Sequence, residues 1–400
     1  MKDQTRWYKS LFKNSLPFIL IVFFASPLLY AQEKEKPAAI DPRPFADNSN
    51  HWYLGFDKHN MINPRPGRPK YKPTELVNIG DNILLFQKVN GGWPKNYDIM
   101  AILSKEQKDS VMQAKQVLNT TFDNGSTYTQ VAALAVIYTA TGIEKYKNAA
   151  LKGLDFIIES QYKNGGWPQF YPIQENYSKY ITYNDGNFTG IMTLLKDIHE
   201  GGSTYTFINE TYRRKLNAAY ERGLQCIIST QITDKGKLTA WCQQHDPVSL
   251  KPAWARKFEP ASICNQESAD LVVFLMSIDR PGKDIINAVQ HAAAWFEESR
   301  IYNTRVNTVQ APKMVTAFRV SETDRVVVTD SSARPVWTRY YELGTHRPIF
   351  CNRDSKIVYS LAEVDRERRD GYSWYTYSPQ KVLDKYPQWK KKLASVNSTL

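Results

Sequence analysis

NGGWPKN at residues 90–96 is the stretch that decides the fold, because it recurs as NGGWPQF at residues 164–170. The tryptophans of the two copies, Trp93 and Trp167, are 74 positions apart, and a further 74 positions lead to Trp241. Self-similarity at a fixed spacing is typical of folds built from one recurring supersecondary unit. The segments around the three tryptophans should therefore share one succession of elements.

An apolar-periodic stretch precedes each tryptophan, and a second one follows it. The helical spacing of apolar residues predicts helices at 76–87, 149–160 and 212–230 before the tryptophans and at 128–139, 189–199 and 266–277 after them. One pair of helices cannot bury its apolar faces alone, so three pairs are expected to close into a ring. The predicted fold class is mainly α, an (α/α)3 toroid or barrel of three helical repeats with a mixed, loop-rich C-terminal part.

The chain outside the repeats differs from them in composition and in the pattern of its apolar residues. A further helix is predicted at 285–299, and a strand at 325–329 within a segment rich in Val, Thr and Tyr. No Gly/Ser/Pro linker divides residues 74–390, so we expect one domain there. Residues 32–73 hold seven of the 21 prolines and predict an extended lead that wraps the domain or stays loose, without catalytic residues.

The first 31 residues have the composition of an export signal. Four Lys and Arg residues precede a nearly uncharged apolar run at 16–29, which ends beside the small Ala31. The run contains Pro27 and is short for a bilayer span, so no stable membrane anchor is expected. We therefore expect 1–31 to be a signal peptide and the mature protein to be secreted or periplasmic.

Composition restricts the partners of such an exported chain. Of its 400 residues 42% are apolar and 23% charged, as in a globular protein, and its formal net charge is +12 at pH 7. The most economical partner of a basic exported protein is an acidic polysaccharide. No Lys/Arg tail indicates nucleic acid as a partner, and GxGxxG, phosphate-loop and GxSxG motifs are missing from the sequence.

Acidic and amide side chains occupy parallel positions in the loops after the first two tryptophans. DNG stands at 123–125 in the first repeat and NDG at 184–186 in the second. If the repeats form a ring, Asp123 and Asp185 project from the same end of it, and carboxylate and amide oxygens are ligands for a hard cation such as calcium. The same residues are ordinary in turns and helix caps, so both interpretations stay open at this point.

Arginines alternate with aromatic residues later in the chain. Arg256 lies in AWARKFEP at 253–260, Arg339 in WTRYY at 337–341 and Arg353 in RPIFCNRD at 347–354. A guanidinium between aromatic rings suits a planar carboxylate beside a sugar ring. Salt bridges from Arg256 to Glu259 or from Arg353 to Asp354 are the simpler interpretation of the same spacing.

Four cysteines remain, and in an oxidising compartment they allow up to two bridges with three possible pairings. Their spacings resemble no zinc pattern, so they are taken as structural, either bridged or free: Cys226, Cys242, Cys264 and Cys351.

These segments together resemble the family-10 pectate lyases of polysaccharide-degrading bacteria, from about Ile79 to Trp374. The landmarks, in chain order, are DNI at 81–83, GGWPKN at 91–96, DNG at 123–125 with YTQ at 128–130, GGWPQFYP at 165–172, YND at 183–185, WCQQHD at 241–246, residues 252–262, RYY at 339–341, RPIFCNRD at 347–354 and RR at 368–369 with Gly371, Tyr372 and Trp374. So many ordered matches make chance similarity improbable.

The resemblance implies a monomeric, calcium-dependent pectate lyase whose catalytic domain spans 74–390. Such an enzyme cleaves α-1,4-polygalacturonate by β-elimination and leaves 4,5-unsaturated oligogalacturonides. The roles implied by similarity are calcium ligation by Asp123, Asn124 and Asp185, with Asp123 at the calcium that holds the reacting carboxylate, substrate carboxylate binding by Arg339 and Arg353, and abstraction of the C5 proton by Arg256. An arginine base has to be neutral, which crowding by calcium and other arginines would favour.

Two other functions fit the same residues, and a lyase for another uronate, such as alginate, also stays open. A glycoside hydrolase could use Asp123 and Asp185 as acid and base, and a non-catalytic binder of acidic glycans could use the same basic groove. Trp93 and Trp167 could be platforms for sugar rings or wedges between repeats. Residues 301–333 are long enough to reshape one end of the groove.

Overall fold

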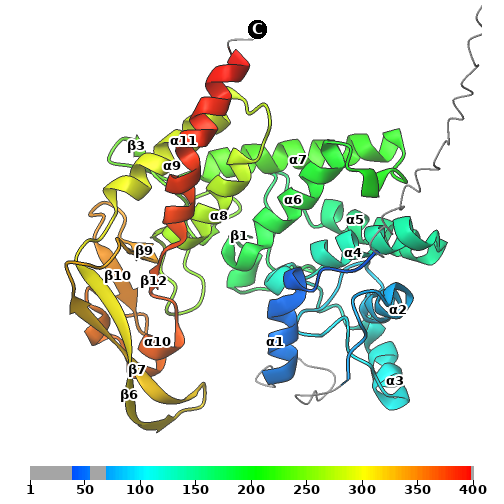
Figure 1. Ribbon diagram of the computed structural model, residues 1–400, viewed down its shortest axis with the longest axis horizontal. Helices are drawn as coiled ribbons and strands as arrows, with labels where there is room; N and C mark the ends of the chain where they lie inside the picture. The colour runs from blue at the N-terminus through cyan, green and yellow to red at the C-terminus, as the bar shows by residue number, and fades with distance from the viewer. Residues whose placement is uncertain (1–37, 55–68, 398–400) are drawn as a thin grey trace, which may run out of the picture. The chain divides into compact units, whose positions relative to one another are not determined.

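The computed structural model describes residues 38–54 and 69–397, of which about half are helical (Figure 1). The predicted export signal at 1–31 lies outside the described residues. Within the two described ranges, no helix is long and apolar enough to cross a membrane.

Paired helices form the body of the protein, at the positions that the apolar periodicity predicts. These helices are α2 (Leu76–Phe86), α4 (Tyr128–Thr141), α5 (Glu144–Glu159), α6 (Asn187–His199), α7 (Glu210–Thr230), α8 (Asn265–Met276) and α9 (Lys283–Glu298). α4 packs on α5, α6 on α7 and α8 on α9, while α4, α6 and α8 contact one another in that order, as do α5, α7 and α9. The helix-rich body is therefore confirmed, as two layers of successive helices.

Apolar periodicity does not predict the other helices of the described chain, which are α1 (Ala46–Leu54), α3 (Lys105–Gln113), α10 (Arg366–Gly371) and α11 (Ser378–Asn397). A cap rather than an apolar face begins α3, because the Ser104 side chain accepts from the Gln107 amide while the Gln107 side chain accepts from the Ser104 amide. α11 packs against α8 and α9.

The described part of the N-terminal lead contains a helix and is not extended as predicted. Phe45 and Trp52, in and just before α1, are 3% and 2% exposed and belong to the main hydrophobic core. The Trp52 ring meets the ring of Phe86 edge-on, with centroids 6.1 Å apart. Contacts with distant residues therefore stabilise α1, which explains why local periodicity does not reveal it.

Short strands and one long hairpin make up the mixed C-terminal part, as predicted. An antiparallel sheet has the order β11-β10-β9-β5, and the strands of the described chain are β1 (Ile181–Thr182), β2 (Thr233–Asp234), β3 (Lys237–Leu238), β4 (Gln244–His245), β5 (Ile263–Cys264), β6 (Thr304–Val315), β7 (Val320–Thr329), β8 (Trp337–Thr338), β9 (Tyr340–Tyr341), β10 (Pro348–Cys351), β11 (Ile357–Val358) and β12 (Tyr375–Thr376). β1 pairs with β4, β2 with β3, β6 with β7 and β8 with β12. Cys226, Cys242, Cys264 and Cys351 are all buried and free.

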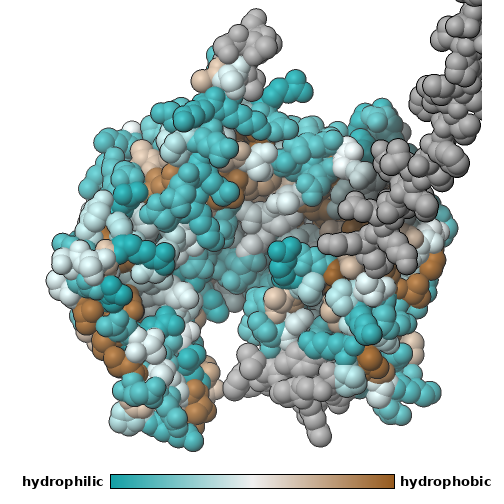
Figure 2. Space-filling model, in the orientation of Figure 1, coloured by the Kyte–Doolittle hydropathy of each residue, from teal (hydrophilic) through white to brown (hydrophobic). Residues whose placement is uncertain are grey.

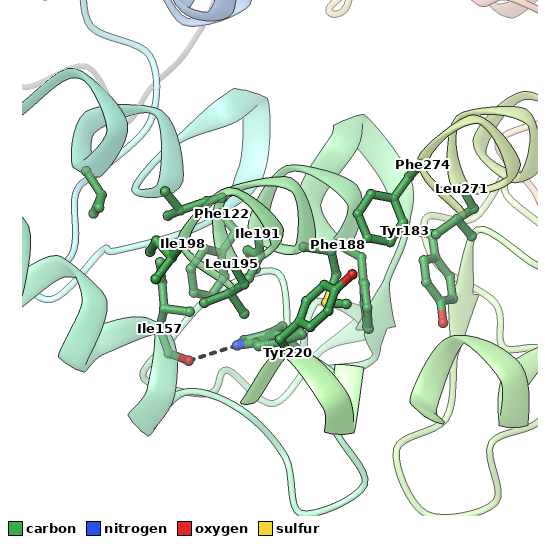
Figure 3. Close-up of a cluster of buried hydrophobic side chains, with 14 of the residues drawn as sticks. Phe122, Ile157, Tyr183, Phe188, Ile191, Leu195, Ile198, Tyr220, Leu271 and Phe274 are labelled. Atoms are coloured by element: carbon green, nitrogen blue, oxygen red, sulfur yellow. Dashed lines mark hydrogen bonds between the residues drawn. The ribbon is translucent and has the colours of Figure 1, made fainter. Parts of the chain in front are cut away.

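The repeated tryptophans are buried wedges and not platforms for sugars. Trp93 and Trp241 are 0% exposed and Trp167 is 1% exposed. Each indole Nε1 donates to the carbonyl of an isoleucine near the end of the preceding helix, at 2.7 Å to Ile83, 2.8 Å to Ile157 and 2.7 Å to Ile227. Figure 3 shows the hydrogen bond at Ile157 within the core. The sequence repeat thus marks an internal packing unit.

A glutamine after each of these helices joins neighbouring repeats. Its side-chain Nε2 donates to the main-chain carbonyl of its own tryptophan loop and to that of an alanine in the next helix of the layer formed by α5, α7 and α9. The three sets are Gln87 with Gly91 and Ala149, Gln161 with Gly165 and Ala219, and Gln231 with Thr239 and Ala288. We call each set a glutamine joint. The joints thus tie each tryptophan loop to the neighbouring helix.

Gly165→Ala is expected to destabilise the protein more than Gly142→Ala. Both glycines have positive φ, of 91° and 67°, but a Cβ at Gly165 would lie 1.9 Å from the Arg222 carbonyl oxygen, while nothing lies within 4 Å of one at Gly142. Gly142→Ala should lower the free energy of unfolding by about 1–2 kcal/mol, and Gly165→Ala by about 4 kcal/mol or more. Urea unfolding followed by tryptophan fluorescence measures both, and equal losses would contradict the prediction.

Candidate active site

Two 3-10 turns that precede α4 and α6 carry the predicted metal ligands. The turns are Asp123–Gly125 and Asn184–Gly186, and they contact each other. Asn124 and Asp185 both adopt the left-handed backbone conformation, with φ of 54° and 50°, which small polar residues tolerate best. Asn124 and Asp185 are therefore equivalent positions of neighbouring repeats.

The carboxylates in these turns are not fully paired with hydrogen-bond donors or positive charges of the described residues. Oδ2 of Asp123 lies 2.7 Å from Nζ of Lys95, but Oδ1 is buried and has no hydrogen-bond partner among the described residues. Asp185 is exposed and helps to line a cavity of about 390 Å³. Partial removal from bulk water, and then the charge of Asp123, raise the pKa of Asp185 to about 7. An unsatisfied carboxylate oxygen beside a second carboxylate is a place where a cation would relieve repulsion.

The oxygen donors present fit a calcium ion. In the part of the chain that the structure describes, no group of three or more His, Cys, Asp and Glu side chains is arranged to hold a metal. Calcium would therefore take carboxylate oxygens from Asp123 and Asp185 and complete its shell of about six to eight oxygens with amide, carbonyl, water or ligand oxygens. The side chain of Asn124 is oriented by its Nδ2, which donates to Oδ1 of Asn96 at 2.8 Å.

Arg339, just before β9, connects the acidic turns to the sheet. It is 5% exposed, and its Nη2 donates to Oδ1 of Asn184 at 3.0 Å and to Glu267. The second oxygen of Glu267 accepts from the Cys264 thiol at 2.5 Å. Burial opposes the charge of Arg339, but Glu267 together with Tyr372, Tyr340 and Cys264 outweighs it, so the pKa of the guanidinium lies well above its ordinary value. Arg339 therefore stays cationic beside Asp185.

Arg256 forms the salt bridge that its spacing allows. Its Nε lies 2.8 Å from Oε2 of Glu259 and its Nη2 lies 2.5 Å from Oε1. Burial alone would raise the pKa of Glu259, but the bonds from Arg256 lower it to about 2. Burial likewise opposes the charge of Arg256, yet Glu259 raises the pKa of the guanidinium above its ordinary value. In this arrangement Arg256 is charged, and its side chain is 43% exposed.

The phenyl ring of Phe258 gathers guanidinium groups around it. The Cζ atoms of Arg368, Arg256 and Arg353 lie 3.9, 5.0 and 5.1 Å from the ring centroid. Burial, and then the positive charge of Arg353, lower the pKa of Arg368 to about 10. Cation–π attraction offsets part of the repulsion between these arginines. Phe258 thus lets positive charge concentrate in one place, as a site for carboxylates requires.

Arg353 contacts Glu367 and the rings of Phe258 and Phe318. Its Nε and Nη2 donate to the two oxygens of Glu367 at 2.8 and 3.0 Å, so its partner is Glu367 and not the neighbouring Asp354. Its Cζ lies 3.8 Å from the ring centroid of Phe318, which belongs to the turn between β6 and β7. Within the described chain Nη1 makes no hydrogen bond, and the side chain is 32% exposed. Nη1 is therefore the edge left for a ligand carboxylate.

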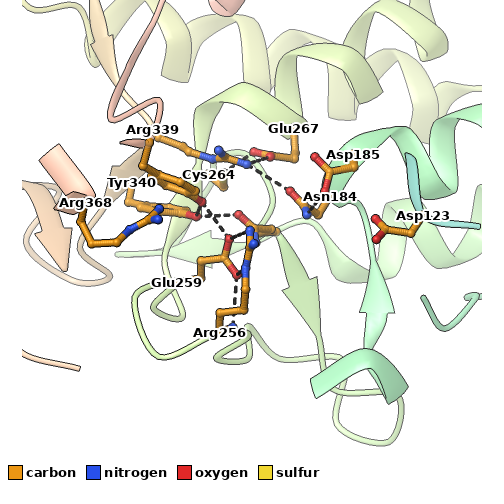
Figure 4. Close-up of polar contacts among 12 residues, drawn as sticks. Asp123, Asn184, Asp185, Arg256, Glu259, Cys264, Glu267, Arg339, Tyr340 and Arg368 are labelled. Atoms are coloured by element: carbon orange, nitrogen blue, oxygen red, sulfur yellow. Dashed lines mark hydrogen bonds and ion pairs between the residues drawn. The ribbon is translucent and has the colours of Figure 1, made fainter. Parts of the chain in front are cut away.

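The fold brings the predicted residues into one region. Figure 4 shows Asp123 and Asp185 on one side and Arg256 and Arg339 on the other. The region thus combines two carboxylates that a cation would stabilise, those of Asp123 and Asp185, with a cluster of arginines.

Comparison with known proteins identifies the family. A family model described as pectic acid lyase matches residues 87–383. The chain belongs to the pectic acid lyase family. It is a polysaccharide lyase. No curated protein matches this pectic acid lyase in a sequence comparison.

Two solved structures resemble this pectic acid lyase, and both are of the family 10 polysaccharide lyase from Cellvibrio cellulosa. One is an alanine mutant in complex with trigalacturonic acid, with 28% identity and a TM-score of 0.65 over 78% of this chain and 92% of that chain. The other has 25% identity and a TM-score of 0.65 over 89% of this chain and 99% of that chain.

Sequence patterns in this pectic acid lyase do not reveal the residues that support the site. Glu259 stands three positions from Arg256, so the spacing made it a visible candidate. Glu267 and Glu367, which pair with Arg339 and Arg353 across 72 and 14 positions, carry no local signal. Phe258 lies inside the motif AWARKFEP at 253–260, but only the structure shows that three arginines contact its ring.

Proposed function

We propose that this pectic acid lyase cleaves α-1,4-polygalacturonate by calcium-dependent β-elimination and releases 4,5-unsaturated oligogalacturonides. The observation that carries the proposal is the arginine cluster around Phe258. Figure 4 shows two of its members, Arg256 and Arg368, across from the carboxylates of Asp123 and Asp185. A repeating polyanion needs cationic groups for its carboxylates, and the resembling lyase was solved with trigalacturonic acid. We further propose an exported monomer whose helical repeats form an (α/α)3 toroid.

The reaction requires the charge on the C6 carboxylate of the reacting uronide to be neutralised. Elimination breaks the C5–H and C4–O4 bonds, forms a C4=C5 double bond and transfers the C5 proton to a base. The departing O4 takes a proton from water and becomes the hydroxyl of the released chain. Charge develops on the carboxylate side of C5, where fixed cationic groups stabilise the transition state. Calcium held by Asp123, Asn124 and Asp185 would supply positive charge there. Arg339 and Arg353 would bind and orient substrate carboxylates.

Arg256 is the proposed base, and Glu259 sets the condition for it. A guanidinium paired with a carboxylate is held in its protonated form, which cannot accept a proton. The neighbouring charges of Arg353 and Arg368 act in the opposite direction, because like charges favour the neutral form. A neutral Arg256 therefore requires that its bond to Glu259 weakens when substrate binds.

Ultraviolet absorbance of polygalacturonate mixed with protein tests the proposed function. With added calcium the absorbance of the unsaturated product should rise, and with a chelator it should not. New reducing ends without that absorbance would instead indicate a hydrolase that uses Asp123 and Asp185 as acid and base. Binding without either signal would indicate a non-catalytic binder.

Phe318→Ala is expected to weaken substrate binding more than turnover. The β6–β7 hairpin exposes hydrophobic residues (Figure 2), and Phe318 at its tip is 62% exposed while it stacks on Arg353. Loss of one exposed cation–π contact, about 0.5–1 kcal/mol, should raise KM about two- to fivefold with kcat nearly unchanged. Val320→Ala is the matched control, because Val320 begins β7 next to the tip, is 54% exposed and makes no cation–π contact to Arg353. An unchanged KM in the Phe318 variant would contradict the prediction.

A further inference from the structure

Helix α1 contributes a buried polar side chain to the neighbourhood of the acidic turns. The helix lies outside residues 87–383, which match the family model, in a lead where no functional residue is expected from the sequence. Asn48 in this helix is 0% exposed. A fully buried asparagine has to spend its donors and acceptor on specific partners, so those partners show what the helix holds.

Asn48 closes a triangle of asparagines. Its Nδ2 donates to the carbonyl oxygen of Asn124 at 2.8 Å, and its Oδ1 accepts from the backbone amide of Asn96 at 2.6 Å. The third side is the bond from Nδ2 of Asn124 to Oδ1 of Asn96 at 2.8 Å. The three residues come from α1, the first tryptophan loop and the first acidic turn, and 76 positions separate Asn48 from Asn124.

The two residues that Asn48 holds are both in an unfavourable backbone conformation. Asn96 and Asn124 have φ of 64° and 54°, in the left-handed region, which asparagine tolerates better than most residues but which is still uncommon for a residue other than glycine. Such residues persist when the surrounding structure over-determines them. Asn48 binds a backbone group of each, and therefore restrains the conformation itself and not only a side chain.

Both restrained positions adjoin the carboxylate that needs a cation. Asn124 follows Asp123 directly, and Asn96 follows Lys95, whose Nζ lies 2.7 Å from Oδ2 of Asp123. One side chain from α1 thus fixes the turn that carries Asp123 and the loop that carries its lysine. The orientation of Asp123, and of Asn124 beside it, depends on α1 remaining in place through Phe45 and Trp52.

We propose that Asn48 is a positioning residue of the calcium site, so that the N-terminal lead is a working part of the enzyme. The inference rests on the proposed function, because it concerns the calcium that Asp123, Asn124 and Asp185 would hold. Groups that orient metal ligands change metal affinity or activity by about 10–100-fold when they are removed. Loss of Asn48 should weaken calcium binding by a factor in this range. It should leave the arginine cluster around Phe258 unchanged.

Calcium titration by calorimetry, on the full mature chain without substrate, tests the inference. Asn48→Ala is expected to weaken calcium binding about 10–100-fold and to raise the calcium concentration for half-maximal elimination equally, while kcat at saturating calcium stays within about threefold of wild type. The matched control is Asn82→Ala, because Asn82 is 3% exposed and donates to the carbonyls of Ile99 and Ala101. Both variants should melt at lower temperature, and only Asn48→Ala should lose calcium affinity.

Three results would overturn the inference. Asn48→Ala with wild-type calcium affinity would do so while leaving the proposed function intact, and equal loss of affinity in Asn82→Ala would reduce the role to general stability. A wild-type enzyme without calcium binding would overturn the calcium part of the proposed function and this inference with it. If Asn48→Ala does not fold, Asn48→Ser is used instead, because it keeps a small polar group at this position. The calcium affinity of Asn48→Ser should then be lower than that of wild type, but by less than the loss expected for Asn48→Ala.

Discussion

Arg256→Ala is expected to lower kcat on polygalacturonate about 10²–10⁴-fold, the contribution of a positioned general base. KM should change little, since Arg339 and Arg353 would still bind substrate carboxylates and only an interaction of the transition state is lost. Initial rates of ultraviolet absorbance over a range of substrate concentrations separate the two parameters. A raised KM with unchanged kcat would instead make Arg256 a substrate-binding residue.

The Glu259→Gln variant tests whether Arg256 acts as a base or only as a fixed positive charge. The Glu259 carboxylate raises the pKa of Arg256, so removing its charge should lower that pKa. A base acts in its neutral form, and the rate should therefore reach half of its maximum at lower pH in Glu259→Gln than in wild type. A pH profile that keeps its midpoint while kcat falls would assign Glu259 a purely structural role and would count against the base.

Asp185→Asn is expected to raise the calcium concentration for half-maximal activity by more than about 100-fold, beyond the range for orienting groups. The substitution removes the charge that, with Asp123, makes the turns attractive to a cation. Calorimetric titration of the variant without substrate should show the same loss. Asp384→Asn, which neutralises an exposed carboxylate on α11, is the matched control and should bind calcium as wild type does. Equal calcium affinity in both variants would remove Asp185 from the site.

Local patterns are sufficient for α2 and for α4 to α9, which form the paired body, but not for the remaining helices or for the tertiary partners. The spacing of Trp93 and Trp167 predicted the succession of helices, because each tryptophan closes one packing unit against Ile83 or Ile157. The sequence left open whether these rings bind sugars, since burial depends on neighbours that come from other parts of the chain. α1 was missed for the same reason, as its core contacts are with distant residues.

The candidate site divides in the same way. Residue types inside motifs predicted Arg256 and Asp185, and the structure places them in one region. The partners that set their charge and orientation are distant in sequence: Glu267 pairs with Arg339, and Asn48 binds Asn124. For Arg353 the neighbouring Asp354 was the obvious partner, but Glu367 takes the bond. A helical turn presents Glu367 to Arg353, which adjacency in the chain cannot do.

The glutamine joints have a consequence for how far the repeats can diverge. The Nε2 of each glutamine donates to main-chain carbonyls only, so these bonds do not depend on the side chains of the accepting residues. In the second joint Oε1 of Gln161 also accepts from the Arg222 guanidinium. The third joint shows this tolerance, because Thr239 accepts where Gly91 and Gly165 accept in the first two. The joint bonds therefore tolerate a change of accepting residue, except at Gly91 and Gly165, where a Cβ would lie 2.4 and 1.9 Å from a main-chain carbonyl oxygen of the neighbouring helix. A designer could exchange surface and cleft residues of one repeat for another set, and the modules would still register against each other.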